Sequence, residues 1–132
     1  MQGSKLAGRI ALVTGATGPI GAALAHQLAA CHVRLALVGH ERRALEQLAA
    51  ATGGIPIVSN LSERGAAERV VAAVRAVAGD ADIVAHCVPN DVHGPLESVS
   101  DELLDEQLAA HVGCLLGLCR AALPSMWARG RG

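Results

Sequence analysis

Short apolar runs without polar alternation recur along this chain, and longer segments with helical spacing of apolar residues separate them. The runs cover residues 9–14, 33–38, 55–59 and 82–88. A strand that is apolar on both sides is typical of a sheet with helices on both faces. Strands that alternate with helices predict βαβ units. We therefore expect an α/β fold with a parallel sheet of four strands.

The helical segments cover residues 19–31, 41–51, 62–78 and 101–126. Pro19 suits the first turn of the first helix, where its missing N–H has no helical partner. The glycines at 53 and 54 are expected to end the second helix. Ser62 is expected to cap the third. The expected buried stripe of the third helix comprises Val70, Val71, Val74 and Val77.

The last helical segment is the longest, and its apolar residues recur at helical spacing. Pro124 is expected to kink or end it, because proline removes a helical hydrogen bond. The recurring residues are Leu104, Leu108, Val112, Leu115, Cys119 and Leu123.

The segment TGATGPIG at residues 14–21 lies between the first apolar run and the first helix. Free backbone N–H groups and the positive helix end favour an anion at such a place. Glycines there let the turn close and let a pyrophosphate approach the backbone. The alternative is a turn that needs its glycines only for its own backbone. The position after a strand and before a helix favours the nucleotide-binding interpretation.

Composition excludes several classes of protein. The 132 residues are 52% hydrophobic and 17% charged, which is too apolar for a disordered chain. A net charge of −1 leaves no basic field for nucleic acid or an anionic membrane. Charged residues are expected to interrupt every apolar stretch before the ~20 residues of a membrane span. Residues 1–9 lack the apolar core of a signal peptide, so the expected location is cytoplasmic.

The cysteines and histidines indicate no special chemistry of their own. None of the four cysteines forms a CxxC pair, and we expect them to be small buried hydrophobic residues. The six histidines are scattered without the spacing of a ligand set, so we expect no metal site.

Five segments together resemble the short-chain dehydrogenase/reductase family. They are the glycine segment, VRLALVGHERRALEQL, SNLSE, DIVAHCVPN and LLDEQLAAHVGCLLGLCRAALPSM. The resemblance covers essentially the whole chain and implies a Rossmann-like, doubly wound sheet with strand order 3-2-1-4. It also implies that residues 1–132 form a single NAD(P)-binding domain, the N-terminal nucleotide-binding half of the family's fold. That domain would be incomplete at its C-terminal side.

The chain departs from the family pattern in three places. The pattern TGxxxGxG would place a glycine at Pro19, whereas Gly18 here makes the spacing TGxxGxxG found in the extended branch of the family. The residues HCVP at 86–89 replace an Asn-Asn-Ala-Gly turn that shapes the cofactor site. Asn60 stands where an aspartate usually meets the adenine, and its amide can still hydrogen-bond.

The resemblance implies a dinucleotide cofactor, and the second strand bears on which one. Gly39 occupies the slot of the carboxylate that binds the ribose of NAD. His40, Arg42 and Arg43 follow, and arginine binds a phosphate through paired N–H donors. This favours NADP, although Glu41 weakens the basic cluster and NAD stays open. The implied cofactor-binding residues are Gly15, Thr17, Gly18, Ile20, Gly21, Gly39, His40, Arg42, Asn60, Leu61 and Val88.

The family transfers hydride with a tyrosine, a lysine four residues later and a nearby serine. This chain has no tyrosine, and its one lysine is Lys5. The family places that pair after a fifth strand, and this chain ends at Gly132, where that strand would begin. We therefore expect a truncated product that is inactive alone. A family asparagine aligns with His111, which could carry a proton or could be an ordinary packed histidine.

Three functions are compatible with these observations. The first is the NAD(P)-binding portion of an oxidoreductase of this family, without the Tyr-x-x-x-Lys pair. The second is a non-catalytic sensor or partner subunit that binds a dinucleotide. The third is an interaction module that pairs with a full-length relative. We also expect self-association, through the long helix or through the exposed edge of the fourth strand.

Overall fold

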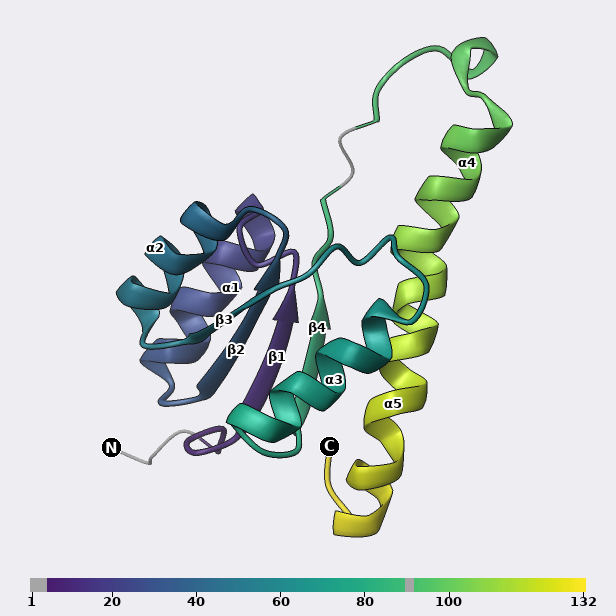
Figure 1. Cartoon of the computed structure of the whole chain (residues 1–132). Helices are drawn as coiled ribbons and strands as arrows, with labels where there is room; N and C mark the ends of the chain where they lie inside the picture. The colour runs from purple at the N-terminus through teal and green to yellow at the C-terminus, as the bar shows by residue number, and fades with distance from the viewer. Residues whose placement is uncertain (1–4, 90–91) are drawn as a thin grey trace.

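A parallel sheet of four strands forms the centre of the molecule. The computed structural model describes residues 5–89 and 92–132. The strands are β1 (Ile10–Thr14), β2 (Arg34–Gly39), β3 (Ile55–Val58) and β4 (Ile83–His86). Their order is β3-β2-β1-β4, and every neighbouring pair is parallel (Figure 1). The expected Rossmann-like strand order is therefore confirmed.

Helices cover both faces of the sheet, as the unalternated apolar runs predicted. The helices α1 (Pro19–Ala30) and α2 (Arg42–Thr52) cover one face, and α3 (Ala66–Val77) and α5 (Cys114–Arg129) cover the other (Figure 1). Successive strand residues point to opposite faces. In β1, Ala11 and Val13 therefore join the core under α1 and α2, while Leu12 joins the core under α3 and α5.

The last helical segment is one continuous rod from Asp101 to Arg129. It consists of α4 (Asp101–Leu108), a π turn (Ala109–Gly113) and α5, and a short 3₁₀ turn (Leu96–Ser98) precedes it. The Ser100 hydroxyl caps its start by accepting a hydrogen bond from the Leu103 N–H at 3.2 Å. The rod continues beyond the expected end at residue 126, and Pro124 lies inside it without ending it.

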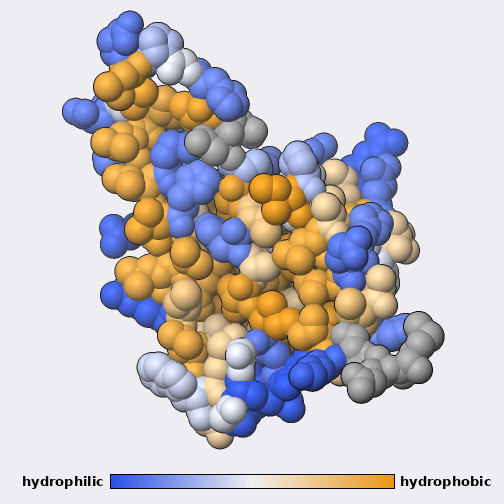
Figure 2. Space-filling view, turned by 180° about the vertical axis from the view of Figure 1, so that it is seen from behind, coloured by the Kyte–Doolittle hydropathy of each residue, from blue (hydrophilic) through white to orange (hydrophobic). Residues whose placement is uncertain are grey.

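The rod buries a mostly small-residue face around Leu118 and leaves most of the recurring apolar residues exposed. Its buried residues in α5 are Cys114, Gly117, Leu118 and Ala122. The stripe expected from the sequence lies mostly on the exposed side, where Figure 2 shows apolar residues along the rod. We call this exposed set the outer stripe, and it consists of Leu104, Leu108, Val112, Leu115 and Leu123.

Two expectations for the third helix are wrong. The helix α3 begins at Ala66 after a left-handed Gly65, and Ser62 does not cap it. The N–H of Ser62 instead bonds to Asn60 Oδ1 at 3.1 Å, so this serine belongs to a turn before the helix. Val70, Val71 and Val74 are buried as expected, but Val77 is 53% exposed, because the next residue, Ala78, takes the buried position at the end of the helix.

The long rod also corrects the expectation about apolar stretches. Among the described residues, the segment Asp101–Arg129 is the one helix long and apolar enough, by length and composition, to cross a membrane. The charged residues in it are too few to interrupt an apolar window of that length. These properties are weak evidence for a span, because helices that pack in soluble proteins share them. Here α5 packs against α3 and β4.

Candidate functional site

The glycine segment forms a tight turn between β1 and α1. Gly15 has a left-handed φ of 61°, and a Cβ there would collide with the carbonyl oxygen of Cys87. A Cβ at Gly21 would collide with the carbonyl oxygen of Gly15. The Gly18 N–H closes the turn by donating to the Gly15 carbonyl at 3.1 Å. Glycine is therefore required at 15 and 21 by the close approach of three backbone segments.

The start of α1 offers hydrogen-bond donors to a ligand. Gly18 is the residue before the first turn, and Pro19 opens the helix. No side chain caps this helix, and no acidic residue lies in its first turn. The backbone N–H groups of that turn carry the positive end of the helix dipole. The local geometry therefore fits a bound anion.

A pocket of about 370 Å³ opens at the carboxyl ends of the strands. Ligands of doubly wound sheets bind at this edge. The pocket brings together seven of the residues singled out from the sequence: Gly15, Gly39, His40, Asn60, Leu61, Val88 and His111. Six further residues, none of them predicted as cofactor-binding, also line it: Ser59, Ser62, Pro89, Val92, Gln107 and Ala110.

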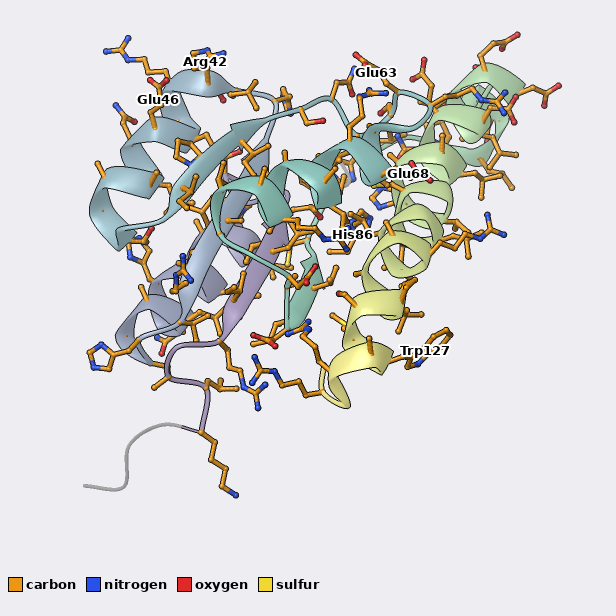
Figure 3. The ribbon with its side chains drawn as sticks, turned by 60° about the horizontal axis from the view of Figure 1, so that its bottom comes forward. Arg42, Glu46, Glu63, Glu68, His86 and Trp127 are labelled. Atoms are coloured by element: carbon orange, nitrogen blue, oxygen red, sulfur yellow. The ribbon has the colours of Figure 1, made fainter. Side chains whose placement is uncertain are left out.

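The remaining predicted residues lie on the elements beside the pocket. A Cβ at Gly39 would lie 3.5 Å from Thr17 Oγ1, which places Thr17 next to the end of β2. Gly18 and Gly21 belong to the turn described above, and the Ile20 side chain is 74% exposed. Arg42 opens α2, and its guanidinium lies 3.5 Å from the Glu46 carboxylate in an exposed pair (Figure 3).

Asn60 has only part of its amide free for a ligand. Its Oδ1 accepts the Ser62 N–H at 3.1 Å, and its backbone carbonyl accepts the Glu63 N–H at 3.3 Å. The side-chain NH₂ group is the part of this residue that can donate to a base. Asn60 therefore shapes the turn and can contact a ligand at the same time.

The helix wall of the pocket was only partly visible in the sequence. Gln107, Ala110 and His111 come from the end of α4 and the π turn. Residues three and four apart lie on one face of a helix, so the assignment of His111 could also have indicated Gln107. The contribution of Ala110 depends on the π turn, for which the sequence offered no signal.

Burial affects two ionisable groups at the end of β4. Burial is the largest effect on His86 and lowers its pKa, as does the charge of the His111 ring, whereas hydrogen bonds to the backbone of Ala110 and His111 act in the opposite direction. Burial raises the pKa of the Cys87 thiol, so this cysteine stays protonated near neutral pH. Among residues 5–89 and 92–132, no group of three or more His, Cys, Asp or Glu side chains could hold a metal ion.

Comparisons with known proteins agree with this geometry. A family model described as short chain dehydrogenase matches residues 9–132. Dehydrogenase/reductase SDR family member 4 of Oryctolagus cuniculus is 29% identical over 133 residues, which cover 96% of this chain and 51% of that protein.

Two solved structures are similar over nearly the whole chain. A short-chain dehydrogenase from Streptomyces avermitilis is 27% identical with a TM-score of 0.88, covering 97% of this chain and 48% of that one. A 3-oxoacyl (acyl-carrier-protein) reductase from Agrobacterium tumefaciens, solved with NADP bound, is 31% identical with a TM-score of 0.82, covering 94% and 50%. This chain thus spans about half the length of the proteins it matches. With a family model that matches from residue 9 to residue 132, the chain belongs to the short-chain dehydrogenase family.

Proposed function

We propose that this chain is the NADP(H)-binding portion of a short-chain dehydrogenase/reductase-type oxidoreductase. One observation carries the proposal: a single pocket joins Gly15 of the glycine turn, His40 after β2, Asn60 after β3 and Val88 after β4. These are the strand ends that a dinucleotide crosses in a doubly wound sheet. The similar reductase solved with NADP bound supports the same cofactor class.

Each part of the cofactor has a matching group of residues. The turn from Gly15 to Gly21, with the uncapped start of α1, would hold the pyrophosphate. The Asn60 amide, Leu61 and Val88 would contact the adenine. A 2′-phosphate would lie near His40 and the exposed guanidinium of Arg42. When bound, NADPH supplies a hydride, and the residues named here bind and orient it.

Hydride transfer in this family needs a tyrosine and a lysine four residues later, and the pocket residues named above include neither. The 132 residues contain no tyrosine, and Lys5 is the one lysine. We therefore propose that this chain binds the nucleotide without completing hydride transfer alone. His111 lines the pocket. We propose that its imidazole carries a proton next to the bound ligand.

An interaction role is the second candidate, and the outer stripe favours it. Exposed apolar residues follow the rod (Figure 2), and Leu123 of this stripe lines a pocket with Ile83 and Val84 of the edge strand β4. In addition, β4 is an edge strand of the described sheet, and edge strands pair readily with other chains. We propose that a second copy of this chain, or a full-length relative, covers these surfaces.

Calorimetric titration of the purified chain with NADPH and then NADH tests the first candidate. The decisive variant is Gly18→Asp, because aspartate is a good residue at a helix start and its Cβ would be in ordinary contact with Pro89 at 3.7 Å. The Gly15 carbonyl oxygen, at 3.3 Å from that Cβ, would have to shift slightly. The new carboxylate should repel the pyrophosphate without unfolding α1. The charge-matched control is Gly53→Asp, which has open space around it; because its left-handed φ of 71° strains any side chain, its folding is checked by circular dichroism before the titration.

The outcomes separate the candidates. Binding of NADPH that Gly18→Asp abolishes and Gly53→Asp preserves would support the nucleotide site. A folded wild-type chain that binds neither dinucleotide would contradict it and would favour the interaction role. Equal loss in both variants would mean that a change of net charge, rather than the glycine turn, controls binding.

A further inference from the structure

His86 joins the sheet to the helix wall of the pocket. It is the last residue of β4, and its ring lies between the sheet and the long rod (Figure 3). Its Nδ1 lies 2.8 Å from the Thr14 hydroxyl at the end of β1. Its Nε2 lies 3.1 Å from the carbonyl oxygen of Ala110 in the π turn. Both ring nitrogens are therefore used, one on each side.

The partners determine which nitrogen carries the proton. A carbonyl oxygen can only accept, so the Ala110 contact requires a proton on Nε2. In the neutral ring Nδ1 then has no proton and accepts the hydrogen bond from the Thr14 hydroxyl. Thr14 is fully buried, so this hydroxyl has no access to water. The geometry assigns His86 the neutral Nε2–H form.

The π turn explains why Ala110 offers its carbonyl. In a regular α-helix, the Cys114 N–H would bond to the carbonyl four residues earlier, which is that of Ala110. Here the Cys114 N–H bonds to Ala109 instead. The Ala110 carbonyl thereby loses that partner, and the His86 ring supplies a donor in its place. Single π turns of this kind are frequent at functional sites.

We infer that His86 is a positioning residue of the nucleotide pocket, which holds the π turn so that Ala110 and His111 form its wall. Ala110 and His111 both line the pocket, as does Val88, two residues after His86. The inference rests on the proposed function as regards the ligand. The hydrogen bonds themselves do not depend on any ligand.

The surroundings of the ring keep it in the neutral form that this role requires. Burial lowers the pKa of His86, and the charge of the nearby His111 ring adds to that effect, while the backbone carbonyls of Ala110 and His111 oppose it. A second proton on Nδ1 would also turn the buried Thr14 hydroxyl from donor to acceptor, leaving its own hydrogen without this partner. The two hydrogen bonds of His86, to Thr14 and to Ala110, tether the π turn to the sheet. We expect acid to weaken this tether and neutral pH to leave it intact.

The test combines nuclear magnetic resonance of the unliganded chain with NADPH titration. We expect the ¹⁵N signals of His86 to have the pattern of the Nε2–H tautomer. His86→Leu removes both hydrogen bonds, whereas His86→Gln keeps an amide that can donate to Ala110 and accept from Thr14. The Leu variant should shift the backbone amide signals from Ala109 to Gly113 and weaken NADPH binding about tenfold, equivalent to ~1.4 kcal/mol. The Gln variant should restore most of the wild-type amide signals and most of the NADPH affinity.

Two further variants keep the test decisive. His26→Gln changes an exposed histidine on α1 and should alter neither measurement. Thr14→Val removes the hydroxyl at nearly constant shape, so it should change the His86 ¹⁵N signals even if His86→Leu fails to fold. A proton on Nδ1 in the wild type, or unchanged π-turn signals in a folded His86→Leu variant, would overturn the inference. Absence of NADPH binding by the wild type would instead contradict the proposed function, with the tether still decided by the signals.

Discussion

Arg129 Nη1 lies 2.6 Å from Asp82 Oδ1, and this contact joins the end of α5 to the start of β4. The same carboxylate accepts the Ile10 N–H at 3.1 Å through Oδ2, and Arg131 Nε lies 3.2 Å from Oδ1. Arg129 also donates to the Ala81 carbonyl at 2.8 Å. Asp82 is 4% exposed, so one buried carboxylate holds the final turn of the rod against the sheet.

Replacement of this carboxylate should destabilise the fold. Asp82→Asn leaves the arginines without their charge partner, and we expect a loss of about 1–3 kcal/mol in the free energy of unfolding. We expect this smaller loss, rather than that of a fully buried ion pair, because the arginines are partly exposed and solvent screens their charges. Urea denaturation would measure it as a lower midpoint with an unchanged slope. The control is Asp80→Asn, which breaks the exposed pair with Arg75 and should cost less than ~1 kcal/mol. Equal losses would contradict the central role of Asp82.

Acid should weaken the same contact. Burial by itself would raise the pKa of Asp82, but the Ile10 N–H, Arg129 and Arg131 outweigh it, so the folded pKa lies below the ordinary value. The resulting stability is fully present above the unfolded pKa of ~3.9 and is lost as pH falls through the folded pKa. Urea midpoints at a series of pH values below 5 should fall less steeply for Asp82→Asn than for the wild type. Parallel curves would refute this assignment.

The packing of α5 on α3 should depend on the absence of a side chain at Gly117. A Cβ there would lie 2.8 Å from the Ala67 Cβ, whereas a Cβ at Gly113 would meet its nearest neighbour, the Leu108 carbonyl oxygen, at an ordinary 3.7 Å. We expect Gly117→Ala to destabilise the chain by about 1–2 kcal/mol through overpacking. Gly113→Ala should be neutral or stabilise by up to ~1 kcal/mol through helix propensity. Thermal denaturation would test whether the two variants change the stability in opposite directions. A Gly117→Ala variant more stable than the wild type would disprove the close contact between Gly117 and Ala67.

Cofactor preference should respond to the residue at the end of β2. A Cβ at Gly39 would lie 3.5 Å from both Leu45 Cδ1 and Thr17 Oγ1, which is ordinary contact, so Gly39→Asp should fold. Its carboxylate would repel a 2′-phosphate and could bind a ribose hydroxyl. We expect the ratio of NADPH to NADH affinity to fall by about tenfold or more. Gly39→Asn supplies the same shape without the charge, and an equal change in that variant would exclude charge as the cause.

Self-association should depend on the outer stripe. We expect the wild type to associate in a concentration-dependent way in sedimentation equilibrium. Two charges introduced by Leu108→Glu and Val112→Glu should abolish this, because both side chains are exposed in the monomer and would be desolvated in an interface. Val77→Glu places a charge at an exposed apolar residue on α3 and should leave association unchanged. A wild type that stays monomeric at high concentration would rule out this role of the stripe.

Local patterns in the sequence were sufficient for the sheet and for the glycine turn. The run at β1 is apolar at successive positions, and the structure buries Leu12 and Val13 on opposite faces. The glycines at 15 and 21 lie where the backbone must approach itself closely. Both features arise between residues close in sequence, or from a periodicity that a strand or helix imposes on its own residues.

Only the tertiary structure decided which face of the long rod packs inward. The outer stripe and the buried set around Leu118 have the same helical spacing, so periodicity alone does not distinguish them. The choice comes from fit: Gly117 leaves room for Ala67 of α3 and Leu118 beside it is fully buried, whereas the leucines of the outer stripe stay exposed. Similarly, Ser62 is a good helix cap by type, but the turn formed with Asn60 places the helix start at Ala66.

The role of His86 shows the same limit for the site. Its partners Thr14 and Ala110 lie 72 and 24 residues away, and the π turn that releases the Ala110 carbonyl has no local sequence signal. The sequence by itself determined the strand order through the family resemblance, the position of the glycine turn, and seven of the thirteen residues that line the pocket. The tertiary structure alone decided the contacts of His86 and Asp82, because a hydrogen bond between distant segments depends on how the elements pack and not on the spacing within either one.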